Sequence, residues 1–350
     1  MIVHIVPTGV FANTWHGSYK DTISRVRLFE QAGVEYRQIR VDEDDPGIVP
    51  ATVARHPDVR FLIEYTVFPH MVKGIRREFP QSFIAVRSHN LEPLQHLDNH
   101  GWWPRRGPLW LLYGMARLAS ADVTCKRYAD AIYSISDWEN RVYWRHLPGL
   151  ARTEWLPYHC PQHLLPDVPP ASRDRRHIAC LPTSQKGRKS WDLVTRFLDF
   201  AQGAAALPSE RNGWEFVVTG NLTSWGLPRC PNVRFAGLVD DLRDFLSSCR
   251  AVAILSPLGY GFKTTVADAI AHGCYVLAHP ALVRRCPDVL RPAIIPFDPT
   301  RPHAIAEAMV RLESPLPLSG VDAELRASAH ALLARDFAIV PRQFSRREAF

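Results

Sequence analysis

The chain has 350 residues, of which 42 are Lys or Arg and 35 are Asp or Glu, so that its formal net charge is +7, and 46% of its residues are hydrophobic. The length suits two domains of about 150–180 residues each, and the ordinary apolar content with a small net charge excludes intrinsic disorder. No stretch of about 18 apolar residues occurs and the start MIVHIVPTGV has no basic leader, so neither a transmembrane helix nor a secretory signal is expected.

The first half of the chain alternates short apolar runs with stretches of helical periodicity. Strands are expected at 2–6, 34–41, 59–64, 83–86, 131–134 and 154–157. Helices are expected at 22–32, 71–78, 109–118 and from Asp137 onward, with a long loop before the third of them. Strands that alternate with helices predict βαβ units and a parallel sheet.

A proline-rich stretch at 157–170 interrupts this alternation, and we interpret it as an interdomain linker because proline stops both helices and sheets. A second alternation follows. Its expected strands are 177–181, 216–219, 233–235, 251–255, 274–278 and 293–295, and its expected helices begin after Lys189 and at Asp240 and span 265–272, 303–312 and 322–336. The predicted domains are 1–158 and 175–330, separated by a linker at 159–174 and followed by a tail at 331–350 that packs back on the first domain.

The seven cysteines are scattered, odd in number and never in a Cys-x-x-Cys pair. This pattern predicts reduced thiols and a cytoplasmic location rather than a disulfide or zinc scaffold.

The most informative segment is 256–279, SPLGYGFKTTVADAIAHGCYVLAH. A buried strand runs into a loop that contains Gly259 and Gly261, and a helix is expected from Thr265. Glycines allow close backbone approach, and a helix N-terminus offers N–H groups and a positive dipole end, so the loop together with Lys263 predicts a phosphate site. The alternative is a plain strand–turn–helix corner with a capping box made by Thr265 and Asp268. Capping does not account for the paired glycines and Lys263.

This segment resembles the donor-site signature of GT-B-fold retaining glycosyltransferases of the family 4 type (glycosyl transferases group 1). In that family a Gly-x-Gly-x-Lys/Arg loop precedes a helix with an acidic residue. Other segments resemble parts of the same family in the same order, namely VRSHNLE, YSISDWENRVYW, TEWLPYHCP, LPTSQKGRKSWDLV and PNVRFAGLVDDL. The resemblance implies an α/β chain with two Rossmann-like, doubly wound domains that face a central cleft.

The resemblance also implies roles in the donor domain. Asp268 would hydrogen-bond the nucleotide ribose, and Lys189 with Lys263 would neutralise the diphosphate. Relatives usually have Glu where this chain has Asp268, and many have Glu where it has Tyr260, so that sugar recognition must differ here. The complete set implied to contact the nucleotide-sugar is Gly17, Gly237, Leu238, Gly259, Tyr260, Gly261, Phe262, Thr264, Thr265 and Asp268.

In the first domain, the resemblance places His89 opposite the donor sugar, so the catalytic set is His89, Lys189 and Lys263. A structural histidine at a strand end is the alternative. His16, Asn90 and Glu92 are candidates for contacting the acceptor, with a plain turn as the alternative for the loop that contains His16.

We expect no metal and no cofactor other than the nucleoside diphosphate-sugar substrate. The acidic pairs 44–45 and 240–241 do not lie in an Asp-x-Asp arrangement at a strand end. Lysines and a helix N-terminus would then stabilise the leaving diphosphate, which is the electrostatic task that a metal ion performs elsewhere.

Residues 101–118, GWWPRRGPLWLLYGMARL, combine aromatic and basic side chains around a short apolar helix. This pattern suits a peripheral membrane contact or a lipid-linked acceptor, and equally a buried helix behind an acceptor loop. No nucleic-acid-binding motif is present, so no nucleic-acid partner is expected.

The predicted function is therefore transfer of a sugar from a UDP- or GDP-sugar to a glycan or lipid-linked acceptor, in polysaccharide or glycoconjugate biosynthesis. Retention at the anomeric carbon is implied by the resemblance alone. Two alternatives remain open, a sugar-nucleotide epimerase of GT-B type and a non-catalytic nucleotide-binding subunit of a glycosylation complex.

Overall fold

The computed structural model describes residues 1–12, 16–49, 53, 56, 58–101, 107–165, 175–182, 187–207, 213–228, 230–299, 301, 303–317 and 320–339. The chain forms two compact units. The first comprises Met1–Pro93, Leu112–Pro161 and Ala323–Phe350, and the second comprises Leu94–Leu111 and Gln162–Asp322. These bounds differ from the predicted domains because 94–111 belongs to the second unit and the first unit resumes at Ala323.

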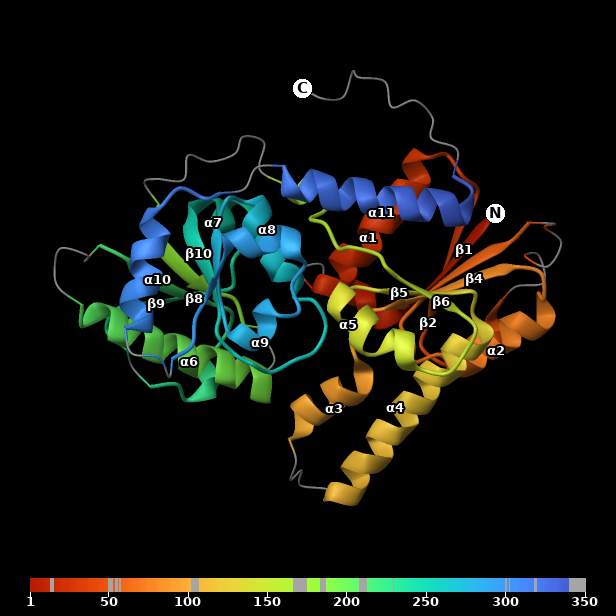
Figure 1. The fold of residues 1–350 in the computed structure, drawn as a ribbon, viewed down its shortest axis with the longest axis horizontal. Helices are drawn as coiled ribbons and strands as arrows, with labels where there is room; N and C mark the ends of the chain where they lie inside the picture. The colour runs from red at the N-terminus through yellow and green to blue at the C-terminus, as the bar shows by residue number, and fades with distance from the viewer. Residues whose placement is uncertain are drawn as a thin grey trace. The chain divides into compact units, whose positions relative to one another are not determined.

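The first unit contains a six-stranded parallel sheet in the order β2-β1-β3-β4-β5-β6, as the alternating pattern predicted (Figure 1). Its strands are β1 (Ile2–Pro7), β2 (Tyr36–Val41), β3 (Arg60–Glu64), β4 (Phe83–Ser88), β5 (Ala131–Ser134) and β6 (Arg152–Trp155). The helices α1 (Gly17–Gln31), α2 (Pro69–Glu78), α5 (Asp137–Val142) and α11 (Val321–Phe337) accompany it.

The second unit contains another six-stranded parallel sheet, in the order β12-β11-β10-β7-β8-β9. Its strands are β7 (His177–Cys180), β8 (Glu215–Thr219), β9 (Val233–Gly237), β10 (Cys249–Ile254), β11 (Tyr275–Ala278) and β12 (Ile294–Pro296). Its helices are α6 (Arg188–Ala205), α7 (Leu242–Ser248), α8 (Thr264–Ala271), α9 (Pro280–Val283) and α10 (Ala304–Glu313). Both sheets are therefore flanked by helices in the manner of Rossmann-like domains, which confirms the predicted fold class.

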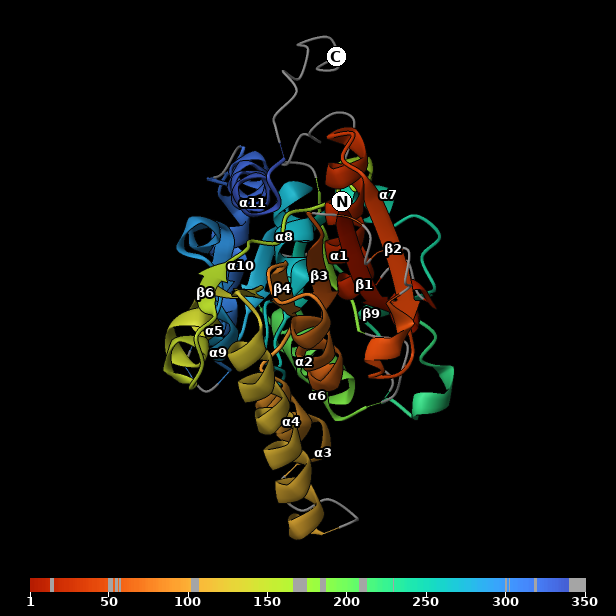
Figure 2. The ribbon, with the colours of Figure 1, turned by 90° about the vertical axis from the view of Figure 1, so that its right-hand side faces the viewer.

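Two helices lie between Ser88 and β5, where only one was predicted. The expected long loop contains α3 (Glu92–His100), and α4 (Pro108–Tyr128) is ten residues longer at its C-terminal end than the predicted helix at 109–118. The rings of His96 and His100 contact Trp110, with centroids 5.1 and 4.8 Å away, so α3 and the start of α4 pack together. α4 extends well beyond the strands (Figures 1 and 2).

Short 3₁₀ helices complete the described structure, at Thr8–Ala12, Pro46–Ile48, Trp144–His146, Gln162–Leu164, Thr223–Trp225 and Asp288–Ala293. The linker predicted at 159–174 is described only in part, since 166–174 lies outside the described residues. Its first residues, His159 and Cys160, are buried in the first unit.

Each core forms because the central strands of each sheet are mostly apolar and buried, and because helices such as α6 carry an apolar stripe. In α6, Val194, Phe197, Leu198 and Ala201 recur at helical spacing and are buried against the second sheet. In the first unit, Ala329, Leu333 and Phe337 of α11 join the core made by β1, α1 and β3. The predicted tail, 331–350, thus has its described part packed in the first unit.

The strand order places one topological switch point in each sheet, where successive crossovers run in opposite directions. In the first sheet β1 is flanked by β2 and β3, and in the second sheet β7 leads to β8 on one side whereas its other neighbour β10 leads to β11. Ligands of doubly wound folds bind beside the carboxyl ends of the strands at such points. The loops after β1 and β3, and those after β7 and β10, are therefore the places to examine.

None of the seven cysteines, all of which lie in the described part of the chain, forms a disulfide bond. Among the described residues, none of the helices combines the length and the apolar character needed to cross a membrane.

Candidate functional site

The loop after β10 has the backbone that its glycines predicted. Gly259 and Gly261 have φ angles of +92° and +90°, which side-chain-bearing residues rarely adopt. α8 begins at Thr264, and its N-cap is Lys263, whose side chain makes no capping hydrogen bond. The capping box proposed as the alternative is therefore wrong, because Thr265 lies inside the helix instead of at its N-cap.

Lys189 and Lys263 converge on this loop, Lys189 from α6 and Lys263 from the end of the loop itself. A Cβ atom built on Gly259 would meet the Lys263 ammonium first, and it would lie 3.2 Å from Cδ of Lys189. Lys189 lies in the first turn of α6 and Lys263 directly before α8. Both side chains are partly exposed. Two predicted phosphate-binding cations are thus brought together at the second switch point.

Arg285 fixes the carbonyl side of the same loop. It is 5% exposed, and its guanidinium donates to the carbonyl oxygens of Gly259 and Pro257, the latter at 3.2 Å. The guanidinium also lies 5.2 Å from the ring centroid of Tyr260. The arrangement leaves the N–H side of the loop facing the other way.

Two side chains of α3 accept from that N–H side. Gly259 N–H donates to Asp98 Oδ2 at 2.6 Å, and Tyr260 N–H donates to Gln95 Oε1 at 3.1 Å. α3 residues from Leu94 onward belong to the second unit, so this contact lies within one unit. Two amides of the predicted phosphate loop, those of Gly259 and Tyr260, therefore donate to side chains of α3.

The remaining donor residues lie on α8 or directly before it. Asp268 is 2% exposed, Phe262 6% and Thr264 9%, whereas Thr265 is partly exposed. Asp268 faces inward, one helical turn after Thr264. In the first turn of α8 the Val266 N–H donates to the Lys263 carbonyl at 2.8 Å, and this end of the helix is the positive end of its dipole.

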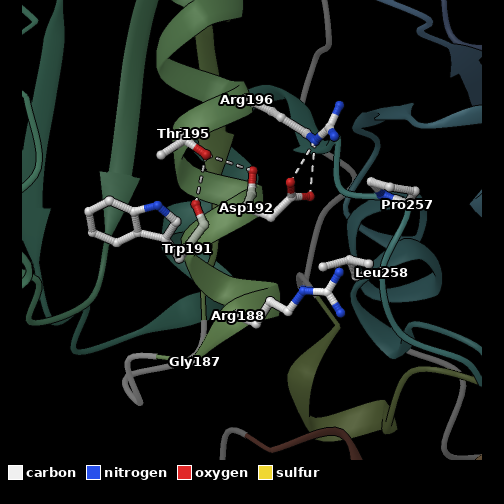
Figure 3. Close-up of a pocket in the computed structure, with 8 residues that line it drawn as sticks. All are labelled: Gly187, Arg188, Trp191, Asp192, Thr195, Arg196, Pro257 and Leu258. Atoms are coloured by element: carbon white, nitrogen blue, oxygen red, sulfur yellow. Dashed lines mark hydrogen bonds and ion pairs between the residues drawn. The ribbon is translucent and has the colours of Figure 1, made fainter. Parts of the chain in front are cut away.

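A groove of about 850 Å³ lies beside this loop (Figure 3). The start of α6 and the loop after β10 line it, through Gly187, Arg188, Trp191, Asp192, Thr195, Arg196, Pro257 and Leu258. Figure 3 shows Arg188 and Arg196 reaching toward Pro257 and Leu258. Asp192 accepts from Arg196 at 2.9 Å and from the Ser256 hydroxyl at 2.6 Å, which ties α6 to the end of β10. Lys186 lies outside the described residues.

The predicted base-binding segment follows β9. Gly237 ends the strand with φ +72°, and its carbonyl accepts from Gly220 N–H at 2.6 Å. The Leu238 side chain is 70% exposed. A base contact here would therefore involve the exposed backbone after Gly237 and not its carbonyl.

In the first unit, His89 follows β4 and is only 6% exposed. Its Nε2 lies 2.8 Å from Glu64 Oε2, and its Nδ1 lies 3.6 Å from Asp21 Oδ2. The ring stacks on Tyr65 at 4.2 Å between centroids, and Tyr65 has the unusual φ of +72°. His89 is therefore held on three sides.

Glu64 is the centre of a buried ionic cluster. It accepts from Arg25 at 2.8 Å through each carboxylate oxygen and from His4 Nε2 at 2.6 Å. Asp21 in turn accepts from Arg87 at 2.9 Å. Burial alone would raise the pKa of both acids, but Arg25 and the hydrogen-bond donors hold the pKa of Glu64 well below its usual value, and Arg25 with Arg87 lowers the pKa of Asp21 to about 2. Both acids are ionised at neutral pH.

Asp21, Glu64 and His89 also offer three potential metal-ligand atoms within 4.8 Å of one another. Arg25 and Arg87 already neutralise the two carboxylates. A divalent cation would have to displace or repel these guanidinium groups, so the donor set fits an ion-pair network better than a metal site. The acidic pairs considered in the sequence act locally, since Asp44 accepts from the N–H groups of His70 and Met71, and Asp241 caps α7.

The acceptor candidates lie around the first switch point. His16 is exposed and directly precedes Gly17, the first residue of α1. Its Nδ1 shares a hydrogen bond of 2.8 Å with the Ser18 hydroxyl. Asn90 Nδ2 donates to Glu92 Oε1 at 3.2 Å. The structure thus brings the candidates together in two sets, one in each unit.

Sequence reasoning missed Arg285, Asp98 and the partners of His89. The cluster had a readable signal, because His4, Glu64 and Arg87 stand in otherwise apolar strands. A charged residue inside a buried strand must have a buried partner. Arg285 and Asp98 had no such signal, since neither lies in a strand.

Comparisons with known proteins agree with this geometry. Residues 192–314 match the family profile described as "Glycosyl transferases group 1". No curated protein sequence matches the chain significantly.

Solved structures match along the whole chain. Sucrose-phosphate synthase from Thermosynechococcus elongatus has a TM-score of 0.63 at 15% identity, with 95% of this chain and 94% of that chain covered. Anabaena HepE in complex with UDP has a TM-score of 0.55 at 12% identity, with coverage of 97% and 96%. An E. coli trehalose-6-phosphate structure bound with UDP-2-fluoro glucose has a TM-score of 0.54 at 11% identity, with coverage of 95% and 96%. These likenesses establish the fold.

Proposed function

Because the chain has the GT-B fold and contains a glycosyl transferases group 1 domain at residues 192–314, we propose that it transfers a sugar from a nucleoside diphosphate-sugar to a glycan or lipid-linked acceptor. The observation that carries this proposal is the convergence of Lys189, Lys263 and the glycine loop at the switch point of the second sheet. An ammonium pair beside the N-terminus of a helix is suited to a diphosphate.

The proposed chemistry needs little from the protein beyond charge and position. The bond between the anomeric carbon and the diphosphate oxygen breaks, the acceptor oxygen attacks from the same face, and the departing phosphate takes the acceptor proton. Lys189, Lys263 and the first amides of α8 would stabilise the negative charge that develops on the leaving group. We propose that the reaction retains the anomeric configuration and needs no metal ion, and that Asp268 binds the ribose.

UDP is the first donor base to test, because HepE was solved with UDP and the E. coli trehalose-6-phosphate structure with UDP-2-fluoro glucose. The test is a thermal-shift and calorimetric screen of UDP, GDP, ADP and their sugar derivatives. We expect one nucleoside diphosphate to bind far more tightly than the rest. Failure of every nucleotide to bind would contradict the proposal, whereas tight binding without turnover would favour the non-catalytic subunit.

Two variants separate a binding role from a structural one. Asp268→Ala should weaken binding of the selected nucleotide by about tenfold, since a charge-assisted hydrogen bond is lost. An unchanged affinity with a lowered melting temperature would assign Asp268 to the fold alone. Turnover in the presence of excess EDTA tests metal independence, and the anomeric coupling constant of the product in proton NMR tests retention.

We further propose that α4 touches a lipid surface. Leu109, Leu112 and Tyr113 are 80%, 54% and 70% exposed at successive helical positions, and the exposed Arg117 follows one turn later. Apolar and basic side chains on one helix are typical of an interfacial contact with anionic lipid. Sedimentation with vesicles that contain an anionic lipid should deplete the protein, and Leu109→Ser with Tyr113→Ser should abolish the depletion. Equal sedimentation of the double variant would exclude this surface.

A further inference from the structure

The N–H side of the glycine loop carries a carboxylate from α3. Asp98 Oδ2 accepts from Gly259 N–H at 2.6 Å, and the neighbouring amide of Tyr260 is bound by Gln95 at 3.1 Å. The main-chain oxygen of Asp98 accepts from Arg188 at 3.3 Å, which also fixes the end of α3 against the start of α6. Gln95 is 6% exposed and donates to Asn99 at 2.9 Å. The contact is thus supported at several points along α3.

Arg285 pins the loop from the opposite side through the carbonyls of Gly259 and Pro257. A hydrogen bond from a backbone N–H to a carboxylate is charge-assisted and stronger than a neutral one. With both faces of its peptide groups held, the loop presents the Asp98 carboxylate in a fixed position.

The Asp98 carboxylate has acceptor sites left for hydrogen bonds from a ligand. An ionised carboxylate offers about four acceptor sites, and Gly259 occupies one of them. Asp98 is partly exposed, and its second oxygen, Oδ1, accepts no hydrogen bond from the residues that the structure describes. A sugar hydroxyl is a donor that such an oxygen binds well, since O–H···O⁻ hydrogen bonds are short and strong.

The position of Asp98 relative to the lysines decides which part of the donor it meets. Lys263 Nζ and Lys189 Cδ are the atoms nearest to the open side of Gly259, the residue that Asp98 binds. A phosphate cannot share an amide N–H with a carboxylate, because the two anions repel each other. The diphosphate would therefore lie beside Lys189, Lys263 and the N-terminus of α8, and the sugar that it carries would lie next to it.

We propose that Asp98 recognises hydroxyl groups of the donor sugar and so contributes to sugar specificity. This inference rests on the proposed function. It also accounts for a carboxylate beside Tyr260 that comes from α3 instead of from the loop itself.

The test compares nucleotide with nucleotide-sugar. Isothermal titration and steady-state hydrolysis or transfer are measured with UDP, UDP-glucose and UDP-galactose, or with GDP, GDP-mannose and GDP-glucose if the screen selects GDP. The variants are Asp98→Ala, Asp98→Asn, which keeps an acceptor for Gly259, and the control Asp199→Asn, an exposed acid of α6.

For Asp98→Ala we expect UDP affinity within about twofold of the parent, a 10- to 100-fold loss of kcat/KM for the preferred sugar, and a smaller discrimination between sugars that differ at one hydroxyl. The kcat/KM of Asp98→Asn should fall between those of the parent and Asp98→Ala. The kcat/KM of Asp199→Asn should equal that of the parent.

Two outcomes would overturn the inference. Tighter UDP binding by Asp98→Ala would make Asp98 an internal competitor of the diphosphate, and equal losses for UDP and UDP-sugar would reduce it to a support of the loop. If the parent protein binds no nucleotide, the proposed function fails. If the parent binds and turns over while both Asp98 variants behave like it, only this inference fails.

Discussion

The two switch points both contain charged side chains, but they accommodate these charges in opposite ways. In the first unit, Glu64, Asp21, Arg25 and Arg87 are all buried and neutralise one another. In the second, Lys189 and Lys263 are partly exposed and stand beside main-chain groups of a glycine loop and a helix N-terminus. Burying the charges of the first arrangement has an unfavourable desolvation free energy, which is offset only by the ion pairs within the cluster. The cations of the second arrangement remain accessible to an anionic ligand.

The comparison teaches that equal location in a fold does not mean equal use. The buried cluster is organised to hold side chains still, His89 among them. In the proposed function, the loop in the second unit binds the donor. Variants in the cluster should therefore change stability, and variants in the loop should change affinity.

The largest effect is expected from Glu64→Ala. Removal of this carboxylate leaves Asp21 as the remaining acidic partner of Arg25 and takes their buried acceptor from His4 and His89, which should lower the free energy of unfolding by about 3–5 kcal/mol. Urea denaturation followed by circular dichroism measures it. The control is Glu307→Ala, since Glu307 is 57% exposed and pairs with Arg301, and such pairs contribute at most about 1 kcal/mol. A loss as small as the control's would show that the cluster does not stabilise the first unit.

The next largest effect is a loss of folding stability at low pH. Burial, with Arg326 nearby, lowers the pKa of His159 to about 4, and His330 faces it with ring centroids 5.6 Å apart. Between pH 6.5 and 4 the unfolded chain binds a proton at this site that the folded chain does not. Stability should therefore be highest above pH 7 and should fall, on the order of 3 kcal/mol for this group, as the pH drops to 4.

Denaturation curves at pH 7.5, 6, 5 and 4 test this expectation. His159→Gln should flatten part of the slope, and His4, His279 and His330, whose pKa values burial also lowers, should contribute to the rest. The exposed His146→Gln should leave the slope as it is. A slope that His159→Gln does not change would assign acid sensitivity to other groups.

A smaller free-energy change, confined to binding, is expected from Lys263→Ala. Loss of one charge-assisted contact to the diphosphate should weaken nucleotide binding by about 10- to 100-fold, with the melting temperature nearly unchanged. Calorimetry measures the affinity, with Lys73→Ala, an exposed lysine of α2, as control. An equally weakened control, or a large drop in melting temperature, would contradict the division of roles between the two switch points.

The smallest effect is expected from Gly259→Ala. Its φ of +92° strains any side chain by about 1 kcal/mol, and the new methyl would also push the Lys263 ammonium aside. Gly226→Ala is the matched control, because Gly226 has φ +67° and no atom within 4 Å of the added carbon. Both variants should lose similar stability, but only Gly259→Ala should lose nucleotide affinity. Equal affinities would show that the position of Lys263 does not matter for binding.

Local features of the sequence predicted most of the fold. Apolar runs located the central strands, which are buried on both faces, whereas the edge strands β2, β6 and β9 are partly exposed. α3 was missed because EPLQHLDNH is polar and has no clear apolar stripe, although Pro93 in its first turn is a typical helix start. α1 begins at Gly17, five residues before its predicted start, because polar residues such as Asp21 and Arg25 are buried there by the ionic cluster.

The candidate site was predictable to the extent that it is made by one contiguous segment. Gly259, Gly261 and Lys263 lie within five residues, and this local pattern predicts their loop. Asp98 is 161 residues away from Gly259, and Arg285 is 26 residues away, so neither contact follows from a local pattern. Pairings of this kind depend on the completed topology.

The return of α11 to the first unit has a consequence for biosynthesis. The core around β1 and α1 needs Leu333 and Phe337, and Asp336 receives the hydroxyl of Tyr133 and the guanidinium of Arg152. A ribosome adds about 5–20 residues per second, so the first unit waits roughly ten to thirty seconds after its sixth strand for its last helix. The second unit is complete before then. The half of the molecule that is synthesised first is therefore the last to be completed, and until that moment the apolar residues that α11 covers lack this part of their core.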